Sequence, residues 1–275
     1  MSLQKQLITA AANGHLEVIK NLIEKGANIH DCNEYALKQA ARFGHLEVVK
    51  YLVKNGANIH IKDYPALNSA ASKGHLKIIK YLVEQGANLQ SIAIDDSFKH
   101  PLRSAAANGH LKVVKYLVNK GCGDKNKALS SAAMTGYLKI IKYLIRKGAD
   151  LHADDESALI WAARNGHIQV VKYLIDNGAV INSFRENPLR AAAANGHLKV
   201  VKYLVNRGAD IHDDDEAALN NAASEGHLDV VKYLIEQGAD FHAYDDYGET
   251  PLTWAIQNGH SQVAKYLIDK GAKLD

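Results

Sequence analysis

Apolar and polar positions along this chain follow the period of an amphipathic α-helix. Leu46, Val49 and Leu52 recur at steps of three, and charged residues fall between them. This spacing lines one face of a helix, whereas a strand would need strict alternation. An Asn-Gly pair follows, and glycine accepts the left-handed backbone that ends many helices. The pattern predicts a helix over 46–53 that is stopped at Gly56.

A shorter helical segment precedes this one. It runs from Ala36 to Phe43 and ends at Gly44. Its alanines are informative, because small residues at the same positions of every copy let such helices lie close to their neighbours. We therefore expect helix pairs that stack into one continuous apolar core.

A Gly-His dipeptide marks nine copies of this pair, with Gly136-Tyr137 filling one gap. The copies follow one another at 30, 30, 35, 27, 30, 30, 30 and 33 residues. Their glycines are Gly14, Gly44, Gly74, Gly109, Gly136, Gly166, Gly196, Gly226 and Gly259. One copy alone cannot bury its apolar face, but a stack of copies can. The sequence thus predicts an all-α solenoid of nine stacked helix-turn-helix units that forms a single domain over residues 1–275.

These repeats resemble those of the ankyrin family. The family pattern runs Thr-Pro-Leu-His, two alanines, Gly-His, an apolar helix and Gly-Ala, and the segment 246–260 matches it most fully. Most other copies are three residues shorter than the family's 33 and have lost Thr-Pro-Leu-His, so we expect short tight turns instead of β-hairpin fingers. The shortened repeat resembles the ankyrin proteins of giant DNA viruses. The resemblance implies a non-enzymatic scaffold that holds a protein in a concave groove formed by the turns and first helices.

Composition narrows the class of protein. With 47% hydrophobic and 23% charged residues the chain is typical of soluble proteins. It shows no leader-like start and no apolar stretch long enough to span a membrane. Cys32 and Cys122 lie some three repeats apart, too far to pair. We expect a cytoplasmic protein, in the host cytoplasm if it is viral, and a monomer, since Ser261 and Ala264 give the last repeat the less apolar face of a cap.

Fourteen histidines raise the question of a metal or catalytic site. Eight stand in Gly-His and five near the repeat ends, so each set forms a ladder. Adjacent rungs are about 8–10 Å apart if helix packing sets them, whereas zinc ligands approach to about 2 Å. We therefore interpret them as turn histidines that bond nearby backbone. No phosphate-binding glycine loop, paired-cysteine motif or nucleophile motif occurs. We predict no catalytic residue, no metal, no cofactor and no small-molecule substrate.

Lysine fills one slot of every second helix. The set is Lys20, Lys50, Lys80, Lys115, Lys142, Lys172, Lys202, Lys232 and Lys265. Such a stripe could follow a phosphate backbone, which makes an anion or nucleic-acid binder the alternative function. A solvated helix face explains the lysines equally well, and the net charge is only +3. The tyrosine after most of these lysines is interpreted as a packing ladder and not as a platform for bases.

The first helices and turns differ from repeat to repeat. Ile160, Trp161 and Arg164 occupy slots that hold other residues elsewhere, and positions freed from packing are expected to be exposed. Trp161 and Trp254 are the first candidate anchors, because tryptophan is frequent among interface hot spots; either could instead fill a gap between helices. The predicted partner-binding residues are Phe43, Tyr64, Phe98, Trp161, Phe184, Tyr247, Trp254, Arg164, Arg190, Asp154, Asp155, Asp214 and Asp215.

The turns of the C-terminal half are acidic. The acids Asp154, Asp155, Glu156, Asp213, Asp214, Asp215 and Glu216 sit there, on turns where we expect them to be solvated. They predict a basic or mixed-charge protein partner, host or viral. The long link over 90–100 is either a projecting finger with its own contact or a turn that has drifted in length.

Overall fold

The computed structural model describes residues 2–61, 64–87, 89, 100–182 and 187–273. Eighteen α-helices and no strand lie among these residues, which confirms the all-α class and the short turns. The chain divides into two compact units, residues 1–132 with 139–149 and residues 133–138 with 150–275. Each unit is described by itself. The single domain over 1–275 stays a prediction.

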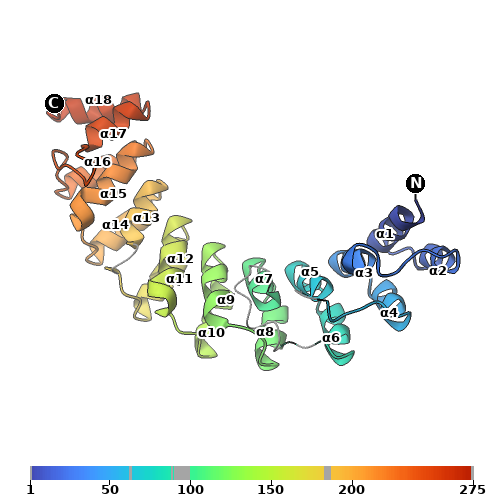
Figure 1. Cartoon of the computed structure of the whole chain (residues 1–275). Helices are drawn as coiled ribbons and strands as arrows, with labels where there is room; N and C mark the ends of the chain where they lie inside the picture. The colour runs from blue at the N-terminus through green and yellow to red at the C-terminus, as the bar shows by residue number, and fades with distance from the viewer. Residues whose placement is uncertain (1, 62–63, 88, 90–99, 183–186, 274–275) are drawn as a thin grey trace. The chain divides into compact units, whose positions relative to one another are not determined.

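Both units consist of helix pairs in which a first helix is followed by a second (Figure 1). Unit 1 contains α1 (Leu3–Asn13), α2 (Leu16–Glu24), α3 (Asp31–Phe43), α4 (Leu46–Lys54), α5 (Pro65–Lys73), α6 (Leu76–Glu84), α7 (Pro101–Ala107), α8 (Leu111–Asn119) and nearly all of α9 (Lys125–Met134) and α10 (Leu138–Arg146). Unit 2 contains α11 (Ala153–Arg164), α12 (Ile168–Asp176), α13 (Pro188–Ala194), α14 (Leu198–Asn206), α15 (Asp213–Ser224), α16 (Leu228–Glu236), α17 (Pro251–Gln257) and α18 (Ser261–Asp269).

Neighbouring repeats bury the apolar face of each second helix. In α4, Val48, Val49 and Leu52 are buried, whereas Leu46 is half-buried. The predicted stripe missed Val48. Val18, at the same place in the first repeat, is 48% exposed, whereas Val263 in the last repeat is 1% exposed, so the preceding repeat covers this flank of the helix. A pattern for one isolated helix does not include that contact.

The first helices pack through their alanines. Ala40 and Ala41 of α3 are fully buried, and α3 packs between α1 and α5. A methyl side chain permits the close helix approach that a branched residue would prevent. The predicted role of the alanines is confirmed.

In six Gly-His pairs, a hydrogen bond joins the histidine to the repeat before it. The Nε2 of His45 lies 2.8 Å from the carbonyl oxygen of Ala12, and that of His227 lies 3.1 Å from Ala194. The same bond recurs from His75 to Arg42, His110 to Ser72, His167 to Met134 and His197 to Arg164. Each carbonyl lies in the last turn of a first helix, where intrahelical donors are missing. The expected histidine–backbone bond is confirmed, but it crosses to the preceding repeat.

The glycine of the preceding repeat makes room for this histidine. A Cβ atom on Gly196 would stand 2.6 Å from the Nδ1 of His227, and one on Gly44 would stand 2.6 Å from the Cε1 of His75. Both glycines also adopt positive φ, at 70° and 86°. Glycine is therefore required twice, by its backbone conformation and by the imidazole beside it.

Three first helices begin with a left-handed turn made of non-glycine residues. In α11, φ is 52° at Asp154, 52° at Asp155 and 64° at Glu156, and α3 and α15 repeat this conformation. Each such residue costs about 1–2 kcal/mol. The Glu156 carboxylate is buried and accepts a hydrogen bond from the Nδ1 of His152. His30 with Glu34 and His212 with Glu216 form the same pair, which offsets part of the strain.

The acidic side chains of these left-handed turns are not all solvated, so that expectation was wrong. Glu156 and Glu216 are buried, and only the aspartates before them are exposed. The hydrogen bond to Glu216 raises the pKa of His212, which favours the charged imidazolium beside the carboxylate.

Three other first helices begin with side-chain caps that are each followed by proline. The Thr250 hydroxyl accepts a hydrogen bond from the backbone N–H of Thr253, and the Asn187 side chain accepts one from that of Leu189. The Nδ1 of His100 accepts a hydrogen bond from the backbone N–H of Leu102 at 3.1 Å. Only 5% of His100 is exposed. Burial, aided by the charge of Arg103, lowers the pKa of His100 to about 4. The cap needs an unprotonated Nδ1, so protonation would break it.

Replacing Gly196 by alanine should destabilise the protein more than replacing Gly208. Both glycines have positive φ, but no atom lies within 4 Å of a Cβ placed on Gly208. Gly208→Ala should cost about 1–2 kcal/mol through its backbone alone, and Gly196→Ala about 1–3 kcal/mol more through the clash with His227. Urea midpoints of both variants measure the difference. In a His227→Ala background, Gly196→Ala should destabilise the protein no more than Gly208→Ala does. If Gly196→Ala still costs more, the imidazole of His227 is not the cause of the difference.

Stability should fall in acid through His100. Because its folded pKa of about 4 lies below the unfolded value of about 6.5, the unfolded state binds a proton first as the pH falls through that window. The resulting loss is about 2 kcal/mol between pH 7.5 and pH 5. His100→Asn, which copies the cap at Asn187, should lose correspondingly less over this range in thermal or urea unfolding. Equal pH dependence of variant and parent would contradict the assignment.

Candidate functional site

We call the first helices and the turns that lead into them the groove face, because the groove expected from the sequence would lie there. In unit 2 these helices are α11, α13, α15 and α17, and they carry most of the predicted binding residues. Trp161 on α11 is 37% exposed, although it lies between buried alanines of the same helix. The guanidinium carbon of Arg164 lies over the Trp161 ring, 5.1 Å from the ring centroid. Trp161 and Arg164 therefore form one aromatic and cationic surface.

A polar pocket of about 220 Å³ lies next to this surface. It is lined by Arg164 from α11, by Asn187, Arg190 and Asn195 from α13 and its ends, by Asn221 from α15, and by two alanines. Arg190 forms an ion pair with Asp214 from the turn of the next repeat. The structure thus brings together Trp161, Arg164, Arg190 and Asp214, which sequence reasoning had named separately. The asparagines of the pocket were not predicted; nothing in their spacing distinguished them from turn residues.

The second predicted anchor has a different environment. The indole N–H of Trp254 donates to Asp245 at 2.7 Å, and the ring of Tyr247 meets it edge-on at 6.3 Å. The backbone N–H groups of Tyr247 and Glu249 also donate to Asp245. Burial raises the pKa of Asp245, but these hydrogen bonds outweigh it and leave the pKa below its ordinary value. Trp254 organises the last turn, and Tyr247 stands exposed beside it.

The remaining predicted residues fall into three groups. Asp154, Asp155 and Asp215 are exposed on the left-handed turns of unit 2. Phe43 is exposed and Tyr64 half-buried at the ends of first helices in unit 1. Phe98 and Phe184, like the long link over 90–99, lie outside the described residues.

Not every variable slot of a first helix is exposed. Ile160, Gln39 and Ala191 are buried, against the expectation for such slots. Gln39 and Ala191 occupy the same repeat position as Trp161, which is 37% exposed, so burial at this position depends on the side chain and its surroundings. Variation between repeats therefore marks the exposed face only in part.

Within the described part of the chain, no group of three histidine, cysteine or acidic side chains is placed to hold a metal ion. Likewise, no helix there is both long and apolar enough to cross a membrane.

Comparison with known families agrees with this geometry. The family model for ankyrin repeats, which spans three copies, matches residues 7–93, 67–155, 129–215 and 212–275. The chain belongs to the ankyrin-repeat family. A search among curated proteins found no match. Ankyrin repeats generally serve as protein-interaction scaffolds and are typically non-enzymatic, which agrees with the coarse function expected from the sequence.

The lysine stripe of these ankyrin repeats is partly engaged in packing. Lys172 lies over the ring of Tyr203 in the next repeat at 5.4 Å, and Lys202 lies over Tyr233 at 5.2 Å. Lys80, Lys115 and Lys232 repeat this arrangement with Tyr116, Tyr143 and Tyr266. Burial raises the pKa of Tyr233, in keeping with a ring that is packed. The tyrosines are thus a packing ladder between ankyrin repeats, as predicted, and their rings are not open platforms for bases.

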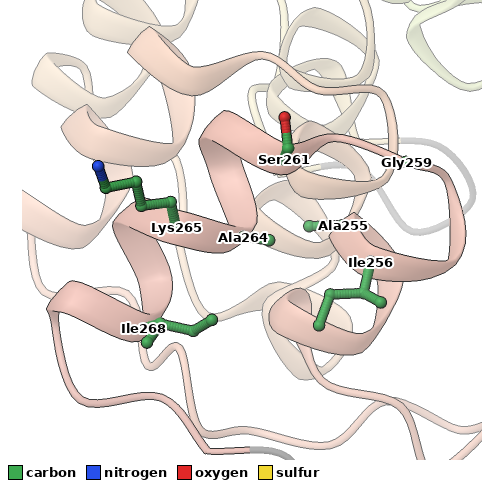
Figure 2. Close-up of a pocket in the computed structure, with 7 residues that line it drawn as sticks. All are labelled: Ala255, Ile256, Gly259, Ser261, Ala264, Lys265 and Ile268. Carbon is green, nitrogen blue, oxygen red and sulfur yellow. The ribbon is translucent and has the colours of Figure 1, made fainter.

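The last ankyrin repeat exposes an apolar hollow of about 410 Å³ (Figure 2). It is lined by Ala255, Ile256, Gly259, Ser261, Ala264, Lys265 and Ile268. Ile268 is 53% exposed, whereas Ile175 at the same place in an inner repeat is 7% exposed under the next repeat. Gly259 has no atom within 4 Å of a Cβ position, in contrast to Gly196. The hollow is thus one half of a repeat interface, and the predicted polar cap is incomplete.

Removal of the indole N–H should destabilise the protein more at Trp254 than at Trp161. Trp254→Phe deletes a donor to Asp245 and should cost about 1 kcal/mol, because hydrogen bonds to charged groups are stronger than neutral ones but this one is half-exposed. It should also bring the pKa of Asp245 back up, which carboxyl NMR titration would detect. Trp161→Phe serves as the matched control in urea unfolding. Equal losses of stability in Trp254→Phe and Trp161→Phe, or an unchanged Asp245 pKa in Trp254→Phe, would contradict the organising role of Trp254.

Proposed function

We propose that this ankyrin-repeat protein is a non-enzymatic scaffold that binds a protein partner on the groove face of unit 2. The observation that carries the proposal is the exposed Trp161, which lies under Arg164 and beside the pocket of Arg190. Tryptophan and arginine are both enriched among interface hot spots.

The charges of this face define the partner further. Exposed Asp154, Asp155 and Asp215 lie on the turns, and Asp214 pairs with Arg190. Complementary charges raise association rates and exclude wrong partners. We propose a partner of mixed charge whose basic residues meet these turns. Because the short repeats resemble those of giant-virus proteins, the partner is proposed to be a host or viral protein of the cytoplasm, bound by a monomer.

The alternative, an anion or nucleic-acid binder that uses the lysine stripe, has less support. The tyrosines that could stack on bases are covered by the lysines of the preceding repeat. What remains is a row of exposed ammonium groups, as on many solvated helices.

Trp161→Ala should weaken capture of the partner without unfolding the protein. Partners are recovered by cross-linking and mass spectrometry and then titrated as purified proteins by calorimetry. Removal of a hot-spot side chain costs at least about 2 kcal/mol, so the dissociation constant should rise more than tenfold. Helical content should stay unchanged, because Trp161 projects from a helix whose buried contacts are made by other residues.

The control is Lys199→Ala with Lys202→Ala on the second helix α14, away from the groove face. This variant should bind the partner as the parent does. If it loses the partner while Trp161→Ala keeps it, the groove proposal is wrong. Tight binding of arbitrary duplex DNA at low salt that falls steeply with added salt would support the lysine alternative.

A further inference from the structure

The apolar hollow formed by α17 and α18 has a shape that the inner repeats do not have (Figure 2). Ser261 replaces the leucine or isoleucine of the other second helices, and Ala264 replaces their valine or isoleucine. These shorter side chains leave space between two exposed isoleucines, Ile256 and Ile268. The volume of about 410 Å³ lies in the range of sites that bind a ligand, roughly 300–1,000 Å³.

Ile256 distinguishes this face from the interfaces between inner repeats. The same position is a fully buried alanine in the eight other first helices, namely Ala11, Ala41, Ala71, Ala106, Ala133, Ala163, Ala193 and Ala223. A methyl group lets the next first helix approach, whereas isoleucine would overpack the same space. The hollow therefore keeps the apolar character of a repeat interface but is not shaped to receive another repeat.

Lys265 gives the hollow a cation whose equivalents contact aromatic rings. In five inner repeats the Nζ of this lysine lies 5.2–5.8 Å from the centroid of a tyrosine ring in the next repeat. Lys265 lines the hollow, and among the described residues no ring lies against it. The first repeat of a second copy would not supply one, because Asn21 stands there in place of the tyrosine.

We infer that this hollow binds an aromatic side chain of a partner protein. The isoleucines and alanines provide apolar contact for a ring, and Lys265 provides the cation over its face. An aliphatic side chain would fill the same space but would offer Lys265 no π face. An acidic side chain would pair with Lys265 and leave the apolar walls in water. The hollow shares no lining residue with the pocket beside Trp161, so this inference goes beyond the proposed function and does not rest on it.

A displayed library of random dodecapeptides, selected on the full chain, tests the hollow. The library is first depleted on Ser261→Leu with Ala264→Val, which restores the side-chain types of the inner repeats and fills the space. It is then selected on the parent protein, and the recovered peptides should share a tyrosine, phenylalanine or tryptophan. Because the filled variant gains apolar surface, non-specific apolar adhesion would be removed in the depletion step. Circular dichroism should show equal helical content in both proteins.

Titration of the strongest peptide by fluorescence anisotropy measures the two contributions. Replacing its aromatic residue by alanine should weaken binding to the parent more than about tenfold, as for a hot-spot side chain. Replacing it by leucine should weaken binding about twofold to fivefold, which corresponds to an exposed cation–π contact. Lys265→Met keeps the length of the side chain without its charge, so the aromatic and leucine peptides should bind this variant with nearly equal affinity.

Lys199→Met is the matched control. It removes the same charge from a second helix of unit 2, but Lys199 is exposed on α14 and does not line the hollow. This variant should keep the parent's preference for the aromatic peptide over the leucine peptide. Trp161→Ala should also leave both affinities unchanged, so failure of this site and failure of the groove function are distinguishable.

Three results would overturn the inference. The depleted selection could yield no peptide, or only peptides without a common aromatic residue. The aromatic and leucine peptides could bind the parent equally. In sedimentation velocity, self-association of the parent that is abolished by Ser261→Leu with Ala264→Val would show that a second copy, and not a partner's aromatic side chain, covers this face.

Discussion

The imidazole of one repeat, bonded to the last-turn carbonyl of the repeat before it, is the contact on which the rest of this structure depends. His227 reaches Ala194 only because Gly196 has no Cβ. The bond supplies a donor to a carbonyl that the helix leaves unpaired. It joins successive first helices, which pack against one another and bury their alanines. Glycine, histidine and alanine are therefore linked requirements of a single joint.

This joint leaves other positions free to differ. The turns leading into α3, α11 and α15 adopt a left-handed path in non-glycine residues, held by a histidine bonded to a buried glutamate. The strain of that path is tolerated because both of its ends are fixed by packed helices. Its consequence is a short turn that projects its aspartates into solvent. The acidic rim of unit 2 is thus a product of backbone conformation as much as of composition.

Trp161 and Trp254 occupy the same position in their repeats but have different surroundings. Trp254 donates to Asp245 and belongs to the one turn that keeps the full-length family pattern. Trp161 follows a shortened left-handed turn, stacks under Arg164 and keeps an exposed face. The longer turn supplies an acceptor that the shorter one lacks. One repeat position therefore holds a turn organiser, Trp254, in one copy and the proposed binding anchor, Trp161, in another.

The sequence by itself determined the all-α class, the nine helix pairs, the glycine stops and the alanine contacts, because each follows from a local pattern repeated nine times. It also identified Trp161, Arg164, Arg190 and Asp214, since their side-chain types stand out against the repeat. Only the tertiary structure showed that Arg164 and Arg190 line one pocket, that Trp161 lies against Arg164 and Asp214 pairs with Arg190, and that Glu156, Glu216 and Ile160 are buried. The physical reason is that burial and pairing depend on the adjacent repeat, and a pattern read within one repeat contains no information about which side chain lies across the joint.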